Sequence, residues 1–350
     1  MQNHELYMRR CLDLASLGAG SVSPNPMVGA VIVHDNQVIG EGWHKGFGQA
    51  HAEVNAINQV IETRGLQSDE LLRNSTLYVS LEPCAHHGKT PPCADLIIQH
   101  QIPEVVVACR DSFDKVNGKG IERLRDAGVK VIESVLEKEA RHLNRRFFTR
   151  LSKKRPYIIL KWAQTADGFF APNKPQQKWI SNKQSKLLVH RWRAEEDAIL
   201  VGKNTALIDN PQLNTRLWEG KNPKRIVLDR NLQLPSGLHL FDKSIETIVL
   251  NEVKTDVQKN LKFISLESFD FYLAESIAFQ LFLMDIQSVI IEGGAKTLDL
   301  FIKAGLWDEA RVFTSDIVWG EGLSAASLLH TAPNESIRLG SDQLSIYYHS

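Results

Sequence analysis

Three metal-binding side chains on three separate segments constrain the fold of this chain of 350 residues more than any other feature. His51 stands two residues before Glu53, Cys84 follows Pro83, and Cys93 follows a pair of prolines. One imidazole and two thiolates form a three-ligand zinc set, and a catalytic zinc ion takes three protein ligands and keeps a fourth position for water. The chain is therefore expected to bring these segments together at one point, with Glu53 beside the metal.

Each segment is predicted to lie at the end of a regular element. Apolar spacing predicts a helix that starts at His51 and a second helix over residues 94–100, directly after Cys93. Residues 76–81 are predicted to form a strand that ends just before Cys84. Because a helix start presents unpaired N–H groups and a partial positive charge, it favours thiolate over thiol.

The pattern His-x-Glu, then Pro-Cys and a second cysteine, is typical of the zinc-dependent nucleobase deaminases. Those enzymes usually have Cys-x-x-Cys, whereas residues 85–92 separate Cys84 from Cys93. Zinc lowers the pKa of bound water to about 7. Glu53 would take that proton, deliver it to a ring nitrogen and protonate the departing ammonia. The alternative is a structural site, for which His86 or His87 would supply a fourth ligand.

The length of the chain exceeds what one hydrophobic core normally serves, which predicts two domains. Helix and strand patterns alternate up to a basic stretch and restart after it. We therefore expect a first domain at residues 1–150, a linker at 151–155 and a second domain at 156–350. The alternation favours an α/β fold with a largely parallel sheet and helices on both of its faces.

Charge and cysteine content restrict the partners and the compartment. Lysine plus arginine and aspartate plus glutamate number 41 each, and a net charge of zero argues against a nucleic-acid partner. No apolar run approaches the ~18 residues of a membrane span, and no signal peptide is indicated. Four cysteines are too few for a disulfide framework, and Cys11 and Cys109 are expected in the core. These observations indicate a cytoplasmic protein that acts without a membrane.

Longer motifs give a specific resemblance. Residues 24–29 are PNPMVG, 42–44 are GWH, 51–54 are HAEV and 83–93 are PCAHHGKTPPC. Over nearly its whole length the chain resembles the bifunctional deaminase–reductases of riboflavin biosynthesis. The resemblance implies a cytidine-deaminase-like three-layer domain with one zinc ion per chain, which deaminates a phosphorylated diaminopyrimidinone ribosylamine. It also implies a dihydrofolate-reductase-like domain that uses NADPH to reduce the ribosyl group to ribityl, and it is compatible with a homo-oligomer.

In the first domain the resemblance assigns substrate contacts to five residues, which are Asn25, His44, His86, Lys89 and Asp111. The histidines offer donors and acceptors to a polar pyrimidine, and Lys89 suits a phosphate or a ring oxygen. The family usually has Asp-Pro-Asn where residues 111–113 are DSF. Because Phe113 cannot supply an amide, the phosphate contact of this domain is expected to differ from that of the family.

In the second domain the resemblance rests on residues 161–168, KWAQTADG, on the motif DNP at 209–211 and on the glycine turn at 292–294. It implies that the substrate contacts Gln177, Arg193, Leu213, Arg216 and Glu292. It implies that NADPH contacts Ala163, Trp179, Thr205, Asp209, Gly294, Ala295, Lys296, Thr297, Leu298, Asp299 and Leu300. Glycines at a strand-to-helix turn let main-chain N–H groups approach a phosphate, and a guanidinium suits a phosphate ester.

Lys161 lies on a predicted strand that is otherwise apolar, where an unpaired lysine would be costly. Our hypothesis is that Lys161 and Glu292 orient the sugar and assist proton transfer as hydride reaches its C1 carbon. Residues 169–175 are bulkier than the small Gly/Ser-rich loop usual in the family. This flap is therefore expected to be stiffer.

Two other functions fit part of the pattern. A polynucleotide-editing deaminase, such as a tRNA adenosine deaminase with an unrelated second domain, shares His-x-Glu and Pro-Cys. It normally has the short Cys-x-x-Cys and needs a basic face. A non-catalytic module would use zinc only for structure, and in it a change at Glu53 would alter no chemistry.

Overall fold

The computed structural model describes residues 3–85, 91–111, 118–173, 180–328 and 332–349. The chain divides into two compact units, Met1–Lys153 and Lys154–Ser350. Helix α7 (Arg145–Lys153) belongs to the first unit and includes residues 151–153, which the sequence analysis assigned to a linker. Phe147 and Leu151, one turn of this helix apart, both line a cavity of the first unit.

The first unit is built on a five-stranded sheet with the order β2 (Gln37–Trp43), β1 (Gly29–His34), β3 (Thr76–Val79), β4 (Glu104–Val107) and β5 (Lys130–Ile132). Strand β1 is antiparallel to both of its neighbours, and the remaining pairs are parallel. Strands β2, β3, β4 and β5 therefore run in one direction, in agreement with the expected largely parallel sheet, and β1 alone runs against them. The reason is the tight turn at Asp35 and Asn36, whose φ angles of 48° and 61° fold β1 and β2 into a hairpin.

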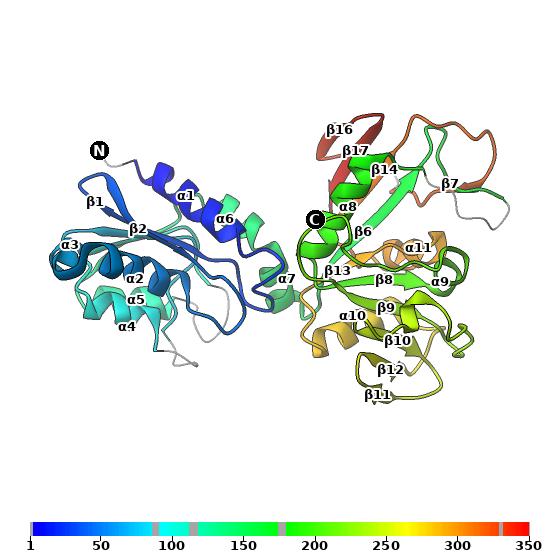
Figure 1. Ribbon diagram of the computed structural model, residues 1–350, viewed down its shortest axis with the longest axis horizontal. Coiled ribbons are helices and arrows are strands. Elements are labelled where there is room, and N and C mark those ends of the chain that lie inside the picture. The colour runs from blue at the N-terminus through cyan, green and yellow to red at the C-terminus, as the bar shows by residue number, and fades with distance from the viewer. Residues whose placement is uncertain (1–2, 86–90, 112–117, 174–179, 329–331, 350) are drawn as a thin grey trace. The chain divides into compact units, whose positions relative to one another are not determined.

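Helices cover both faces of this sheet and make a three-layer unit (Figure 1). One face carries α1 (His4–Ser16) and α6 (Glu137–Leu143). The other face carries α2 (Ala52–Arg64), α3 (Ser68–Arg73), α4 (Cys93–Gln99) and α5 (Lys119–Asp126), and the short helix η1 (Gly65–Gln67) links α2 to α3. Because β2, β3 and β4 are mutually parallel, α2 and α4 both begin at the carboxyl edge of the sheet, where their first residues can meet.

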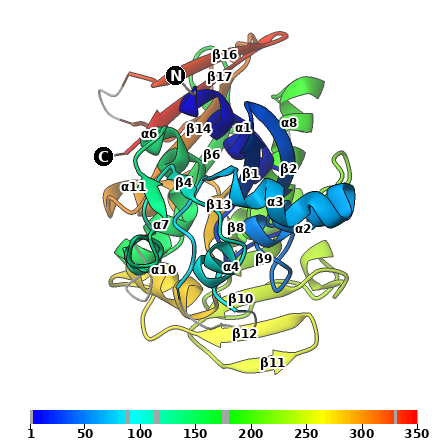
Figure 2. The same cartoon turned by 90° about the vertical axis from the view of Figure 1, so that its left-hand side faces the viewer.

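The second unit contains a ten-stranded sheet with the order β11 (Asp256–Gln258), β12 (Leu261–Ser265), β10 (Thr247–Asn251), β9 (Lys224–Leu228), β8 (Ala198–Gly202), β13 (Ser288–Ile291), β6 (Tyr157–Gln164), β14 (Glu309–Thr314), β17 (Asp342–Tyr348) and β16 (Glu335–Leu339). The strands from β12 to β14 are parallel. Antiparallel strands end the sheet, with β11 at one edge and the β16–β17 hairpin at the other (Figure 2). Strands β7 (Phe169–Ala171) and β15 (Leu323–Ser324) form a separate pair.

A change of face beside β13 positions the second candidate site. Helices α8 (Lys183–Glu195) and α9 (Lys203–Asp209) pack on one face of the large sheet, with the short helix η2 (His239–Phe241), whereas α10 (Leu273–Leu283) and α11 (Ala295–Lys303) pack on the other. Strands β8 and β13 are neighbours, yet α9 and α11, which follow them, lie on opposite faces. Such a switch point opens a crevice at the carboxyl ends of the strands, where α/β proteins bind ligands.

Within the described ranges, the chain forms no helix with both the length and the apolar character that a bilayer crossing requires. All four cysteines are free thiols. Cys11 and Cys109 are 0% and 1% exposed, so their prediction as core residues is confirmed.

Candidate active sites

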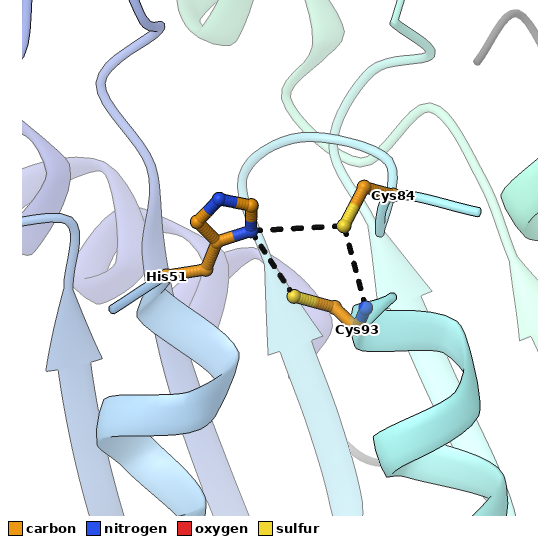
Figure 3. A group of neighbouring side chains, drawn as sticks. All are labelled: His51, Cys84 and Cys93. Carbon is orange, nitrogen blue, oxygen red and sulfur yellow. Dashed lines mark hydrogen bonds between the residues drawn. The ribbon is translucent and has the colours of Figure 1, made fainter. Parts of the chain in front are cut away.

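The three predicted zinc ligands converge at the carboxyl edge of the first sheet. His51 caps the start of α2, Cys93 is the first residue of α4, and Cys84 lies in the segment after β3. His51 Nδ1 lies 3.3 Å from Cys93 Sγ and 3.6 Å from Cys84 Sγ (Figure 3). Tetrahedral zinc, with bonds of about 2.0 Å to nitrogen and 2.3 Å to sulfur, separates such ligand atoms by about 3.5 Å. The residues therefore fit one zinc ion.

The described residues provide three ligands for this centre and no fourth. The ligand atoms of His51, Cys84 and Cys93 lie within 4.8 Å of one another, and no other described histidine, cysteine or acidic residue joins the group. His86 and His87, the alternative fourth ligands, lie outside the described residues. Three protein ligands are the set that a catalytic zinc ion uses.

Hydrogen bonds prepare this group for a cation. The Cys93 and His51 side chains lower the pKa of the Cys84 thiol to about 4, although burial opposes the shift. The main-chain N–H of Cys93, at the start of α4, also donates to Cys84 Sγ at 3.3 Å. The hydrogen bond to Cys84 and burial raise the pKa of the Cys93 thiol, so that Cys93 holds its proton more tightly than Cys84. Metal binding displaces such protons from its ligands.

Glu53 lies in the first turn of α2 and is 3% exposed. It lines a cavity of about 310 Å³ together with His51 and Cys84. Burial raises the pKa of the Glu53 carboxyl to about 7. A carboxyl group that titrates near neutrality can both accept and return a proton, which is what a general acid–base residue must do.

Asn25 and His44 line the same cavity and are linked to each other. His44 Nδ1 lies 3.1 Å from the carbonyl oxygen of Ala50, so this nitrogen carries the proton and donates. Burial lowers the pKa of His44 and keeps the ring neutral, which leaves Nε2 to accept from Asn25 Nδ2 at 3.2 Å. The amide oxygen of Asn25 therefore remains to accept a hydrogen bond from a ligand N–H group.

Glu82, which the sequence analysis missed, holds Asp111 against this cavity. Its carboxylate is 4% exposed and accepts from four main-chain N–H groups at 2.9–3.3 Å, those of Asp111, Gly118, Gly120 and Ile121. Glu82 stands two residues before Cys84, and these hydrogen bonds join the segment after β3 to the start of α5. Asp111 is placed in the cavity wall, whereas His86, Lys89 and Phe113 lie outside the described residues.

In the second unit Lys161, Arg193 and Glu292 form a cluster. Arg193 of α8 donates from Nη2 to Glu292 at 2.9 Å, and from Nη1 to the carbonyl oxygen of Asn214 at 3.2 Å. Burial lowers the pKa of Lys161 on β6, an effect that the nearby Glu292 opposes. Burial alone would raise the pKa of Glu292, but Arg193 and Lys161 outweigh it and lower the value. The cluster thus keeps a carboxylate in the electrostatic field of a half-buried lysine.

His190, one turn before Arg193 on α8, belongs to the same cluster and was missed from the sequence. It is 4% exposed, and its Nδ1 atom has no hydrogen-bond partner among the described residues. Burial, with the charges of Arg193 and Arg216, lowers its pKa to about 4. The ring is therefore neutral at physiological pH. Its spacing of three residues from Arg193 was the only signal in the sequence.

The predicted cofactor residues lie around the switch point. Residues 295–300 form the first turns of α11, which Gly294 precedes, and a Cβ atom at Gly294 would lie 3.4 Å from Oγ1 of Thr205. At Gly202 and Gly293 a Cβ atom would lie only 2.5 Å from atoms of Thr297. The helix start is therefore packed tightly against the ends of β8 and β13. This arrangement suits the close approach of a phosphate to main-chain N–H groups.

Some of the residues predicted to bind substrate or NADPH have side chains that a ligand at the switch point cannot contact. Leu213 and Leu298 are 2% and 0% exposed and belong to the hydrophobic cores, so only their main chains remain for a ligand. Arg216 is exposed, and Ala163 shares a sheet face with Lys161. Asp209 follows Thr205 by one turn of α9, and burial raises its pKa. Gln177 and Trp179 lie outside the described residues.

These features define a zinc-dependent hydrolase domain of the nucleobase-deaminase class, followed by an α/β domain with a topological switch point between β8 and β13. Residues 1–109 match the family model of the cytidine and deoxycytidylate deaminase zinc-binding region, and residues 156–340 match the RibD C-terminal domain. The chain belongs to the RibD family of riboflavin biosynthesis proteins.

Individual relatives agree with this assignment over the whole chain. RibD of Aquifex aeolicus is 40% identical over 340 residues, which are 95% of this chain and 92% of that protein. RibD of Escherichia coli is 32% identical, covering 90% and 88% of the two chains. A deaminase/reductase structure from Thermotoga maritima has a TM-score of 0.89 at 38% identity, with 99% of each chain covered. Because the second unit matches the RibD family, the alternative of an editing deaminase with an unrelated second domain is wrong.

Proposed function

We propose that the protein catalyses two consecutive reactions of riboflavin biosynthesis. The Thermotoga maritima relative is described as a diaminohydroxyphosphoribosylaminopyrimidine deaminase and 5-amino-6-(5-phosphoribosylamino)uracil reductase. The first reaction replaces an amino group of the phosphorylated diaminopyrimidinone by a carbonyl oxygen and releases ammonia. The second uses NADPH to reduce the ribosyl group to ribityl. The observation that carries the proposal is the convergence of His51, Cys84 and Cys93 at a cavity that also contains Glu53.

The deaminase residues divide the chemistry among them. His51, Cys84 and Cys93 would hold a zinc ion, which would supply the electrophile that makes water acidic enough to attack at neutral pH. Glu53 accepts a proton from the attacking water, passes it to a ring nitrogen and protonates the leaving ammonia. The amide oxygen of Asn25 accepts a hydrogen bond from an N–H group of the pyrimidine, because the bond from its NH₂ group to His44 fixes the orientation of the amide.

The reductase residues act on the sugar. The start of α11 and Thr205 would hold NADPH, which would supply the hydride for reduction at the C1 carbon of the ribosyl group. The reduction also needs one proton, and Lys161, a half-buried amine whose pKa is lowered, is the acid that delivers it. Glu292 accepts a hydrogen bond from a sugar hydroxyl, and its bond to Arg193 fixes the direction in which it does so.

The test is incubation with 2,5-diamino-6-(5-phosphoribosylamino)pyrimidin-4(3H)-one and NADPH, with ammonia release and NADPH oxidation measured separately. We expect ammonia without added NADPH, and NADPH oxidation only after the deamination product forms. Reduction then yields 5-amino-6-(5-phosphoribitylamino)uracil. Ammonia release without subsequent NADPH oxidation would overturn the second assignment and leave the first intact.

The matched variant is Glu53→Gln, which keeps the shape of the side chain but removes its acid–base function. We expect it to retain zinc, to release no measurable ammonia and to oxidise NADPH normally when the deaminated intermediate is supplied. Unchanged ammonia release would instead support a zinc site without a catalytic role for this residue.

The proposed partners are small molecules, namely a phosphorylated pyrimidine and NADPH, and not a nucleic acid. The neutral net charge of the chain supports this choice. Four free thiols, two of them in the zinc set, support action in a reducing cytoplasm.

A further inference from the structure

Helix α7 forms part of the wall of the deaminase cavity. Phe147, Arg150 and Leu151 of this helix line the cavity of about 310 Å³ that also contains His51 and Glu53. The three residues lie three and four positions apart or adjacent, so they share one face of the helix. Of the stretch 151–155, which the sequence assigns to a linker, Leu151 is thus part of the cavity wall.

Asn144 holds this helix in place. Its side chain accepts from the main-chain N–H of Met27 at 2.8 Å and donates to the carbonyl oxygen of the same residue at 2.8 Å. Asn144 is 2% exposed and stands at the junction of α6 and α7, three residues before Phe147. Met27 directly follows Pro26, which lines the cavity. This pair of hydrogen bonds therefore fixes the face of α7 that carries Arg150 relative to the segment 24–26 of the cavity wall.

Arg150 is the only lysine or arginine among the described residues that line the cavity. The acidic residues there are Glu53, Glu82 and Asp111, and the Glu82 carboxylate already accepts four main-chain hydrogen bonds. The proposed substrate carries a phosphate ester at the end opposite its pyrimidine ring. A dianion of this kind needs a cationic partner when it enters a partly closed cavity.

Resting on the proposed function, we propose that Arg150 binds the phosphate ester of the deaminase substrate. In this arrangement Asn25 and Glu53 face the pyrimidine ring, and α7 provides the phosphate end of the site. A guanidinium presents two parallel N–H donors to phosphate oxygens, which a lysine does not. The assignment gives this chain a phosphate contact in place of the amide that the family pattern has at position 113.

The test compares two substrates in the Arg150→Met variant, namely the phosphorylated ribosylamine and its dephosphorylated form. We expect the KM of deamination to rise about tenfold to hundredfold for the phosphorylated substrate, since a hydrogen bond between charged groups is lost. The kcat value should change little, because the phosphate is bound equally in the ground state and the transition state. The KM for the dephosphorylated substrate should stay at the wild-type value.

Two further variants separate charge from fold. Arg150→Lys should recover part of the lost affinity, because it keeps the charge and loses the paired donors. Arg145→Met is the matched control, because Arg145 lies on the same helix, does not line the cavity and donates to the carbonyl oxygen of His142. Zinc content and NADPH oxidation should remain normal in all three variants, which confirms that each is folded.

Equal KM changes for both substrates, or no change for either, would overturn the assignment of Arg150. A separate titration with ribose 5-phosphate needs no turnover and is followed by calorimetry. The wild type and Arg145→Met should bind one more molecule per chain than Arg150→Met. If the wild type binds this extra molecule but releases no ammonia from the substrate, the proposed function fails and the phosphate site stands.

Discussion

Arg193 and Glu292, which are 99 residues apart in the chain, form a hydrogen-bonded ion pair at 2.9 Å with side chains that are 11% and 12% exposed. Only one carboxylate oxygen of Glu292 is used, and the other has no partner among the described residues. A buried acceptor without a partner is costly unless a ligand completes it. The ion pair therefore holds Glu292 at the carboxyl end of β13, near Lys161, with its Oε1 atom available to accept a hydrogen bond from a ligand.

The first prediction concerns Lys161. Replacing it with methionine keeps the length and apolar stem of the side chain but removes the proton donor and the positive charge beside Glu292. We expect NADPH oxidation with the deaminated intermediate to fall at least about hundredfold, the usual size of a general acid–base contribution. Ammonia release should be unchanged, because the deaminase residues lie in the other unit.

The control for this variant is Lys224→Met. Lys224 lies on β9 of the same sheet and pairs with Glu246 at 3.7 Å, away from the cluster. The Lys224→Met variant should reduce the deaminated intermediate at the wild-type rate. Preserved reduction in Lys161→Met would remove this residue from the mechanism.

The second prediction concerns the pH dependence of stability. His190 has a pKa of about 4 in the folded protein, against 6.5 for an ordinary histidine. A group whose pKa is lowered by folding binds protons more tightly in the unfolded chain. Stability is therefore complete above about pH 6.5 and declines as the pH falls from there towards 4. The shift corresponds to a loss of at most about 3 kcal/mol in the free energy of unfolding.

His190→Gln should remove this decline. Urea denaturation of the wild type and the variant at several pH values from 7.5 to about 4.5 measures the difference in their free energies of unfolding. We expect that difference to shift steadily in favour of the variant as the pH falls. His239→Gln changes an exposed histidine of the same unit and serves as the control. A difference that is independent of pH would show that His190 is charged, or exposed, in the folded protein.

The third prediction concerns zinc. Cys93→Ser removes one of three ligands and should purify with less than one tenth of the metal of the wild type, as measured by atomic absorption. Cys109→Ser changes a cysteine that is also buried but is not one of the three ligands, and whose thiol donates instead to the carbonyl oxygen of Ser80. It should keep a full complement of zinc. Metal loss in both variants would indicate that the effect is one of folding.

The metal centre could be predicted from sequence because its chemistry is local. Helix starts at His51 and Cys93 and a strand end before Cys84 place three ligands at one sheet edge, and the structure has α2, α4 and β3 there. The α/β class also follows from the pattern of short strands and helices. The β1–β2 hairpin could be predicted as well, because the turn residues Asp35 and Asn36 separate two strand-like runs.

Contacts between distant segments could not be read from spacing. Residues 136–151 are predicted as one helix, whereas the structure has α6 and α7 with a break at Asn144. The break depends on the bonds from Asn144 to Met27, which lies 117 residues earlier in the chain. The positions of Arg150 and Glu82 in the deaminase cavity could not be predicted for the same reason. Both depend on contacts with distant segments, and the neighbouring sequence does not indicate those contacts.

The last prediction concerns Glu82, whose carboxylate joins the end of β3 to the start of α5 through four main-chain hydrogen bonds. In Glu82→Gln an NH₂ group faces two of these N–H donors, which leaves them buried without an acceptor. We expect the free energy of unfolding of the first unit to fall by about 2–4 kcal/mol. The urea midpoint for loss of ammonia release should fall, while the midpoint for loss of NADPH oxidation stays close to the wild-type value. The control is Glu70→Gln, which changes an exposed residue of α3 and should shift neither midpoint. An equal shift of both midpoints in Glu82→Gln would mean that Glu82 supports the whole chain and not the wall of the deaminase cavity.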